Sequence, residues 1–168
     1  MGKVLKLAKE ISADQKIVFA INKTDSLPHI TLGLGNYKKD ELKIMAKKAA
    51  AGWLELDRFA EGKGYVMINF KKSSWLKKIC MTDWEKYQPH LTLARFKERK
   101  TAIEIAYSLN QKARWSKTWV NRIALTEMGL NGTSTKIVKS ISLDLGVVSE
   151  KIGHEQYRYS SNSIANFV

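Results

Sequence analysis

The stretch QPHLTLARF, residues 88–96, decides how this chain is interpreted, because LPHITLGLG at residues 27–35 shares its pattern. Residues 28–32 recur at 89–93 with one change, from isoleucine to leucine. Each copy opens with proline, a residue confined to strand starts and edges. We therefore predict two strands, Pro28–Leu34 and Pro89–Phe96, that arose by duplication of a strand–helix unit.

The duplicated pattern places chemistry-bearing side chains together. Strand alternation puts His29 and Thr31 on one face, and His90 and Thr92 on the corresponding face of the second copy. If both faces meet in one cleft, a neutral histidine can take a proton from an attacking hydroxyl or water, and a protonated one can donate to the leaving oxygen. The threonine hydroxyls can donate to non-bridging phosphate oxygens. The pattern predicts a phosphodiester-cleaving site.

A single histidine in a strand is more often a core residue than a catalyst. Two matching copies in a chain with only three histidines favour the active site. Metal catalysis is not expected, because the histidines show no close ligand spacing and no carboxylate cluster accompanies either copy. We expect no cofactor.

The paired His-x-Thr-Leu strands resemble those of the 2H phosphoesterase superfamily, which includes 2′–5′ RNA ligase-like proteins, cyclic nucleotide phosphodiesterases and viral 2′,5′-phosphodiesterases. HLTLAR, residues 90–95, is similar to the second motif of the ligase-like branch, and VNRIALTEMGLNGTSTKIVKSISL, residues 120–143, to its closing hairpin. The resemblance spans Lys16 to Leu143. It implies a bilobal, pseudo-two-fold α+β fold with antiparallel sheets lining a central cleft, and catalysis without metal by His29, Thr31, His90 and Thr92.

The rest of the chain is predicted to form one domain, with residues 146–168 as a C-terminal extension. Two features depart from the 2H pattern: a helix precedes the first strand, and the chain continues beyond the family core. The remaining expected helices are Lys3–Ile11, Tyr37–Ala51, Ser73–Met81 and Lys100–Asn110. The remaining expected strands are Gln15–Ile21, Trp53–Phe59, Tyr65–Phe70, Thr118–Met128 and Thr135–Leu143, with hairpins at residues 60–64 and 129–132.

Composition narrows the ligand class. Lys and Arg total 29 against 16 acidic residues, a net charge of +13, which favours polyanions such as RNA or phosphorylated small molecules. The alternative is a merely solubilising surface, because the lysines come in scattered pairs. No apolar run reaches the length of a membrane span, no signal peptide is recognisable, and a single cysteine suits a reducing compartment. We expect a cytoplasmic protein without a membrane partner.

Three residues near the second motif are candidates for substrate contact, and a third histidine lies near the C-terminus. Arg95 lies three positions after Thr92, on the opposite face of an ideal strand, so it reaches the phosphate only near a bulge or strand end. Tyr87 and Trp84 precede the second motif, and their rings can stack on a base. The alternative is that both rings belong to the core. His154 is expected to be an exposed residue without a role.

The sequence thus predicts a phosphodiesterase for a 2′,3′-cyclic phosphate, a 2′–5′ linkage or a cyclic oligonucleotide second messenger, the last of these destroyed by viral immune-evasion enzymes of the superfamily. Two alternatives stay open. One is a nucleotide- or RNA-binding module that has lost turnover, and the other is RNA end joining, the reverse of the same chemistry.

Overall fold

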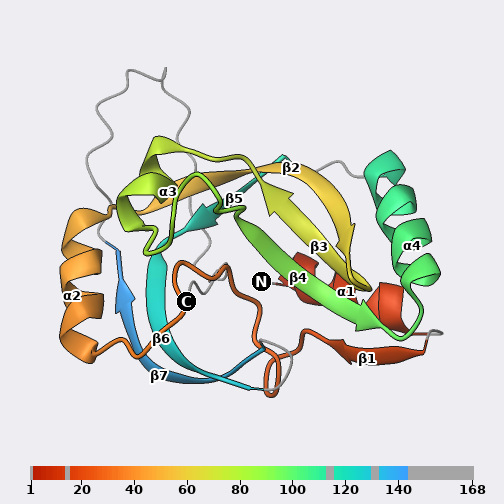
Figure 1. Cartoon of the computed structure of the whole chain (residues 1–168), viewed down its shortest axis with the longest axis horizontal. Coiled ribbons are helices and arrows are strands. Elements are labelled where there is room, and N and C mark those ends of the chain that lie inside the picture. Colours follow the sequence, from red (N-terminus) through yellow and green to blue (C-terminus); the bar gives the residue numbers. More distant parts are fainter. Residues whose placement is uncertain (1, 14–15, 113–115, 130–132, 144–168) are drawn as a thin grey trace.

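The computed structural model describes residues 2–13, 16–112, 116–129 and 133–143, which form an α+β fold (Figure 1). The predicted extension at 146–168 and His154 lie outside the described residues. The elements are α1 (Gly2–Ser12), β1 (Ile17–Ala20), α2 (Lys39–Lys48), β2 (Gly52–Gly62), β3 (Tyr65–Phe70), α3 (Ser74–Ile79), β4 (His90–Phe96), α4 (Arg99–Lys112), β5 (Lys117–Val120), β6 (Arg122–Met128) and β7 (Ser134–Ser142).

A curled antiparallel sheet of five strands forms the larger part of the fold. Its strand order is β1-β4-β3-β2-β5. The second half of the long strand β2 pairs with β3 and its first half pairs with β5, so the sheet bends into half a barrel (Figure 1). Helix α4 packs against β2 and β3, and α1 packs against β1 and β4. Val66, Ile68 and Leu93 are fully buried in the resulting core.

The β2–β3 hairpin confirms the predicted turn, with a shorter loop than expected. β2 continues to Gly62, which leaves Lys63 and Gly64 as the two-residue connection. Both have positive φ, 53° and 85°. Two successive residues of positive φ define the type I′ turn, whose twist matches that of the flanking strands. Gly64 therefore supplies one of the two unusual conformations, and a lysine adopts the other.

The second sheet contains β6 and β7, and α2 packs against both strands (Figure 1). The expected single strand Thr118–Met128 is wrong, because the chain changes sheets at Asn121. Before this residue β5 pairs with β2, and after it β6 pairs with β7. The Asn121 carbonyl accepts from the Leu143 amide at 2.8 Å, which fixes the crossing point. The expected strand Thr135–Leu143 is present as β7.

The first copy of the motif is not a strand, so the prediction for Pro28–Leu34 is wrong. Its one ladder contact is an isolated antiparallel bridge between Leu27 and Ser134. Further along, the Leu32 carbonyl accepts from the Met81 amide at 2.7 Å. One end of the segment bonds to β7 and the other to the loop after α3, and proline contributes no donor. No single strand therefore lies in register beside it.

The four expected helices are present, and local capping explains two of their starts. The Ser73 side chain accepts from the Leu76 amide at 3.2 Å at the start of α3. The Lys38 amide donates to the Glu41 carboxylate at 2.6 Å, so α2 begins at Lys39, two residues later than expected. None of the helices in the described part of the chain has the length and apolarity to cross a membrane.

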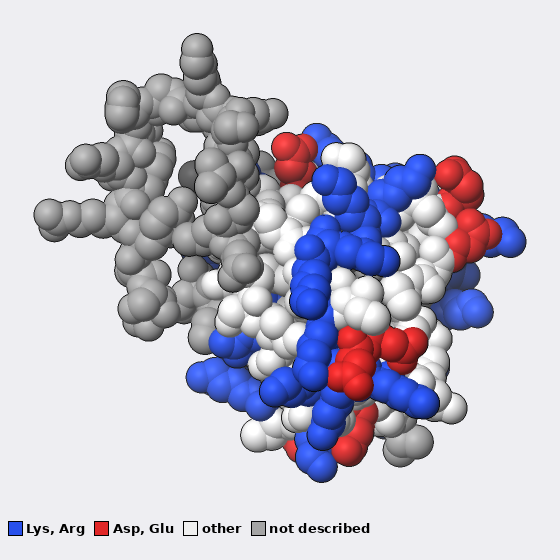
Figure 2. All heavy atoms as spheres, turned by 90° about the vertical axis from the view of Figure 1, so that its left-hand side faces the viewer, with Lys and Arg blue, Asp and Glu red and all other residues white. Residues whose placement is uncertain are grey.

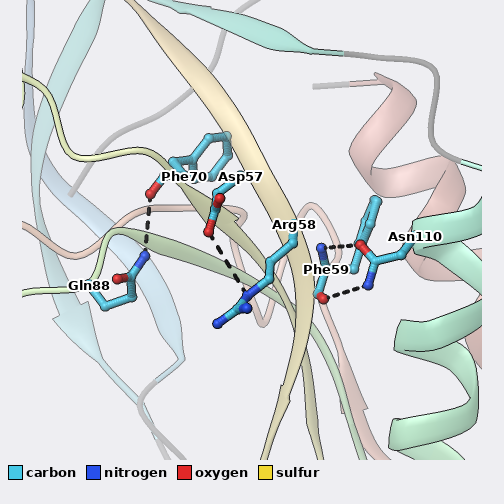
Figure 3. Close-up of polar contacts among 6 residues, drawn as sticks. All are labelled: Asp57, Arg58, Phe59, Phe70, Gln88 and Asn110. Atoms are coloured by element: carbon cyan, nitrogen blue, oxygen red, sulfur yellow. Dashed lines mark hydrogen bonds and ion pairs between the residues drawn. The ribbon is translucent and has the colours of Figure 1, made fainter.

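One side chain extends the edge of β2 beyond the end of its partner β5. The Asn110 carboxamide of α4 accepts from the Phe59 amide at 2.8 Å and donates to the Phe59 carbonyl at 2.9 Å (Figure 3). This pair of bonds reproduces what a neighbouring strand would make, and it fixes α4 against the sheet.

Candidate active site

The second motif lies on β4, between β1 and β3. His90 is opposite Asn69 and Thr92 is opposite Met67, but Arg95 is opposite Tyr65. The register shift shows that β4 carries one extra residue, a β-bulge, between Thr92 and Arg95. Since Tyr65 and Met67 share one face of β3, Arg95 shares the face of Thr92 rather than the opposite one.

The sequence places Arg95 on the face of Thr92 only if β4 is bulged, and the bulge is present. Its guanidinium lies 5.0 Å from the centroid of the Tyr65 ring, a cation–π contact. Tyr65 also makes an edge contact with Phe19 of β1, with centroids 6.1 Å apart. Arg95 thus stands on the sheet face that carries the second motif.

The first motif presents its side chains as predicted although its backbone is not a strand. Ile30 and Leu32 are each 2% exposed and belong to the core. His29 and Thr31 alternate with them, are half-buried and line cavities. The alternation of buried and half-buried side chains over residues 28–32 is therefore present without a strand.

Both motif histidines are held in the same way. The Nδ1 of His29 lies 2.8 Å from the carbonyl of Leu27, and the Nδ1 of His90 lies 2.9 Å from the carbonyl of Gln88. A carbonyl oxygen only accepts, so each Nδ1 carries the proton and donates it. In the neutral ring this leaves Nε2 as the unprotonated nitrogen available to a substrate. In each motif the proline lies between the two bonded residues.

The carbonyls that orient the rings are themselves anchored to a neighbouring strand. The Leu27 amide donates to the Ser134 carbonyl of β7 at 2.8 Å. The Gln88 side chain donates to the Phe70 carbonyl of β3 at 3.3 Å (Figure 3). One anchor uses the backbone and the other a side chain, yet both fix the residue two positions before the histidine.

The two imidazoles interact electrostatically. Burial lowers the pKa of His29 below its ordinary value of 6.5, the bond to the Leu27 carbonyl opposes this shift, and the charge of His90 lowers the pKa further. His29 is thereby kept neutral at neutral pH, the form that accepts a proton.

A tyrosine joins the two motifs. The Tyr87 hydroxyl donates to the Thr31 carbonyl at 2.8 Å, so the residue before the second motif fixes the backbone of the first. Burial, and secondarily the charge of Cys80, raises the pKa of Tyr87, which keeps this donor protonated. Its ring also lines the cavity beside His90. Trp84 packs against Tyr87 with centroids 5.9 Å apart, and the ammonium of Lys72 lies 5.3 Å from its ring centroid.

Two adjoining cavities flank the motifs. The cavity that we call the His29 cavity has a volume of about 380 Å³ and is lined by His29 and Thr31. The His90 cavity, of about 570 Å³, is lined by His90, Thr92 and again Thr31. Both volumes fall in the range of small-molecule sites. Because Thr31 lines both cavities, the two motifs meet there.

Sequence reasoning missed several polar residues of this region. Arg58 of β2 is opposite Asn69, which is opposite His90, so the three form one row across the sheet. The Arg58 guanidinium contacts only the adjacent Asp57 at 3.9 Å among the ion pairs of the described residues (Figure 3). Thr126 and Ser134 line the His29 cavity, and their hydroxyls are bonded at 3.0 Å. Cross-strand pairing, which no single segment reveals, places Arg58 in the row of His90 and brings Thr126 and Ser134 to the His29 cavity.

Neither a metal-ligand cluster in the described residues nor a match to known proteins indicates a function. Within the described ranges, no group of three or more His, Cys, Asp or Glu residues is arranged to hold a metal ion. A scan against known protein families finds no match, and a search of curated proteins finds none that matches. The function is therefore inferred from the residues and geometry of the site.

Proposed function

We propose that this chain is a metal-independent phosphodiesterase of the 2H type that cleaves ribonucleotide phosphodiester bonds by two-histidine acid–base catalysis. One observation carries the proposal: the imidazoles of the two motifs are held through Nδ1 by the same backbone contact, and Thr31 of the first motif lines one cavity with His90 and Thr92 of the second. A structural histidine needs no such pairing, whereas a proton relay across one phosphate needs two oriented Nε2 atoms.

In this proposal His29 is the base, because burial lowers its pKa, and His90 is the acid. Neutral His29 takes the proton from the attacking oxygen, either a neighbouring ribose hydroxyl or water, as the new P–O bond forms. Protonated His90 gives its proton to the leaving oxygen as the old P–O bond breaks. The phosphate keeps its charge, and one proton has moved from His90 and one to His29. Attack by the ribose hydroxyl yields a cyclic phosphate, and attack by water yields a phosphomonoester.

The threonines and the arginine support the developing charge. Thr31 lies where the cavities meet and Thr92 stands in the His90 cavity, so their hydroxyls can donate to the non-bridging oxygens. Arg95 shares the sheet face of Thr92 and adds positive charge. The side of the molecule that carries α2 displays a band of Lys and Arg (Figure 2), which agrees with a polyanionic ligand.

The bilobal arrangement of the 2H fold belongs to the same proposal. The second motif lies in the five-stranded sheet, and the first is bridged to β7 of the two-stranded sheet. Each lobe would then supply one histidine. Because the two sheets differ in size, the proposed pseudo-two-fold relation is confined to the motifs.

The test is a substrate panel with chelator present. The intact protein is incubated in EDTA with 2′,3′-cyclic mononucleotides, 2′–5′ oligoadenylates, cyclic di- and trinucleotides and RNA ends, and the products are identified by mass. We expect turnover of at least one class. His29→Ala and His90→Ala should each lower the rate by about 10²–10⁴-fold, and the double variant should be little slower than either single one.

Controls separate chemistry from folding. Both alanine variants should retain the circular dichroism spectrum of the unaltered chain, and added imidazole should restore part of the lost rate. Binding of nucleotides without turnover would replace the enzyme by a binding module. Recovery of a chelated, inactive protein by Zn²⁺ or Mn²⁺ would replace the two-histidine mechanism by a metal-assisted one.

A further inference from the structure

The His29 cavity has no established occupant, and its walls restrict what can enter. It is lined mainly by apolar side chains, among them Leu32, Leu42, Met45 and Leu125. Hydroxyls of Tyr37, Thr126 and Ser134 provide a few polar contacts. Among the described residues, no lysine, arginine or carboxylate lines this cavity, and the lowered pKa of His29 favours its neutral form.

An uncharged cavity rejects a phosphate. Moving an anion into apolar surroundings without a paired cation is strongly unfavourable. A nucleobase is neutral, flat and edged with a few hydrogen-bonding groups, which matches a mainly apolar cavity with a few hydroxyls in its wall. The scissile phosphate must therefore lie outside this cavity, beside Thr31.

The His90 cavity has a different character. Tyr65, Tyr87 and Met67 form its apolar wall, and its rim carries Asp83 and Lys86, paired at 3.4 Å. It lies on the other side of Thr31. A substrate with its phosphate at Thr31 thus meets one binding cavity in each direction.

The boundary between the cavities is built from exposed apolar side chains. Leu34 is 65% exposed and Met128 is 57% exposed, and both line both cavities together with Thr31. Large apolar groups left in water on the shared wall of two cavities indicate a surface that a ligand covers.

We propose that the substrate carries a nucleobase on each side of the scissile phosphate, and that the His29 cavity, with Tyr37 in its wall, binds one of these bases. This inference rests on the proposed function and selects dinucleotide or longer substrates over single-base 2′,3′-cyclic phosphates. Tyr37 is a specificity determinant here: it lines the His29 cavity and contacts the close-packed Gly33 backbone, where an added Cβ would lie 2.7 Å from the Tyr37 hydroxyl.

The test compares a two-base substrate with two analogues that each lack one of its bases. The probes are 2′–5′-linked diadenosine monophosphate and two analogues in which one or the other adenine is absent. For the unaltered protein we expect kcat/KM for the two-base substrate to exceed that of at least one analogue by about tenfold, because stacking of one base on aromatic side chains is worth roughly that much or more. Tyr37→Ala should bring this ratio close to one.

Two further variants make the result specific. Tyr107→Ala is the matched control, because Tyr107 is 68% exposed on α4 and lines neither cavity, and it should keep the tenfold ratio. Leu34→Ala truncates an exposed side chain, so it should fold even if Tyr37→Ala does not, and it should also lower the ratio. A ratio near one in the unaltered protein, or a ratio that survives both cavity variants, overturns the inference while the observed turnover upholds the phosphodiesterase.

Equilibrium binding separates the two possible failures. If none of the probes is turned over, the proposed function fails, and calorimetry with the same three compounds still tests the cavity. Tighter binding of the two-base compound that Tyr37→Ala abolishes supports a base site in the His29 cavity. Equal affinity for all three compounds overturns it.

Discussion

The Tyr87–Thr31 hydrogen bond can be removed with the loss of one oxygen atom. Tyr87→Phe keeps the ring that lines the His90 cavity and packs against Trp84, but it removes the hydroxyl that donates to the Thr31 carbonyl at 2.8 Å. The bond is partly buried and joins residues 56 positions apart. Its loss should therefore loosen the first motif relative to the second.

The expected magnitude follows from the burial of the bond. A partly buried hydrogen bond whose acceptor loses its partner contributes about 1–2 kcal/mol to the free energy of unfolding. For a chain of this size, each kcal/mol shifts Tm by roughly 2–4 °C, so Tm should fall by about 2–8 °C. Displacement of Thr31 from the phosphate should lower kcat by about tenfold, with a smaller change in KM.

The assay pairs thermal unfolding with steady-state kinetics and uses Tyr107→Phe as the control. Tyr107 is 68% exposed on α4, and an exposed substitution of this kind changes stability by less than about 0.5 kcal/mol. If Tyr87→Phe and Tyr107→Phe show the same Tm and the same kcat, the bond does not position the motif and the reasoning is wrong.

Three other predictions concern single residues. The folded-state pKa of His29 lies below its ordinary value of 6.5, so His29 contributes stability that is present above pH 6.5 and lost as the pH falls through the folded pKa. Urea unfolding from pH 5 to 8 should show this loss of unfolding free energy, and His29→Gln should make the loss smaller. Asn110→Ala should cost about 2 kcal/mol of unfolding free energy by removing two bonds to β2, whereas Gln111→Ala, exposed on the same helix, should cost almost nothing in the same urea titration. Thr92→Val should lower the single-turnover rate by roughly 10–10³-fold with a much smaller loss of substrate affinity, and the control Thr101→Val on α4 should leave both unchanged. A collapse of affinity at a constant rate would make Thr92 a binding group only.

The strand β4, the hairpin β2–β3 and the four helices were predictable because their signals are local. Apolar alternation, a proline at the start and a glycine in the turn each act within a few residues. The prediction of a strand at Pro28–Leu34 was wrong, although residues 28–32 differ from residues 89–93 at only one position. Whether an extended segment becomes a strand depends on a neighbour in register, and here one end bonds to Ser134 and the other to Met81.

The candidate site was predictable in its residues and not in its support. His29, Thr31, His90 and Thr92 follow from the repeat itself. The side of β4 on which Arg95 lies depends on a bulge that no local pattern announces, since Leu93 and Ala94 are both fully buried. Likewise, the row from Arg58 to His90 exists only once β2, β3 and β4 are side by side, and the bond from Tyr87 to Thr31 forms only once the two motifs are brought together.

The repeat conserves a way of holding an imidazole more than it conserves a strand. In both copies the carbonyl two residues before the histidine accepts from Nδ1, and the intervening proline restricts the backbone that brings the carbonyl back to the ring. This contact is local, so it forms equally in a ladder-paired strand and in an unpaired segment. What each copy needs from the rest of the fold is one anchor for that carbonyl, and Ser134 and Phe70 provide the two anchors. Nearly the same five residues can therefore orient a histidine in two different backbone settings, which the proposed two-histidine site between unlike sheets requires.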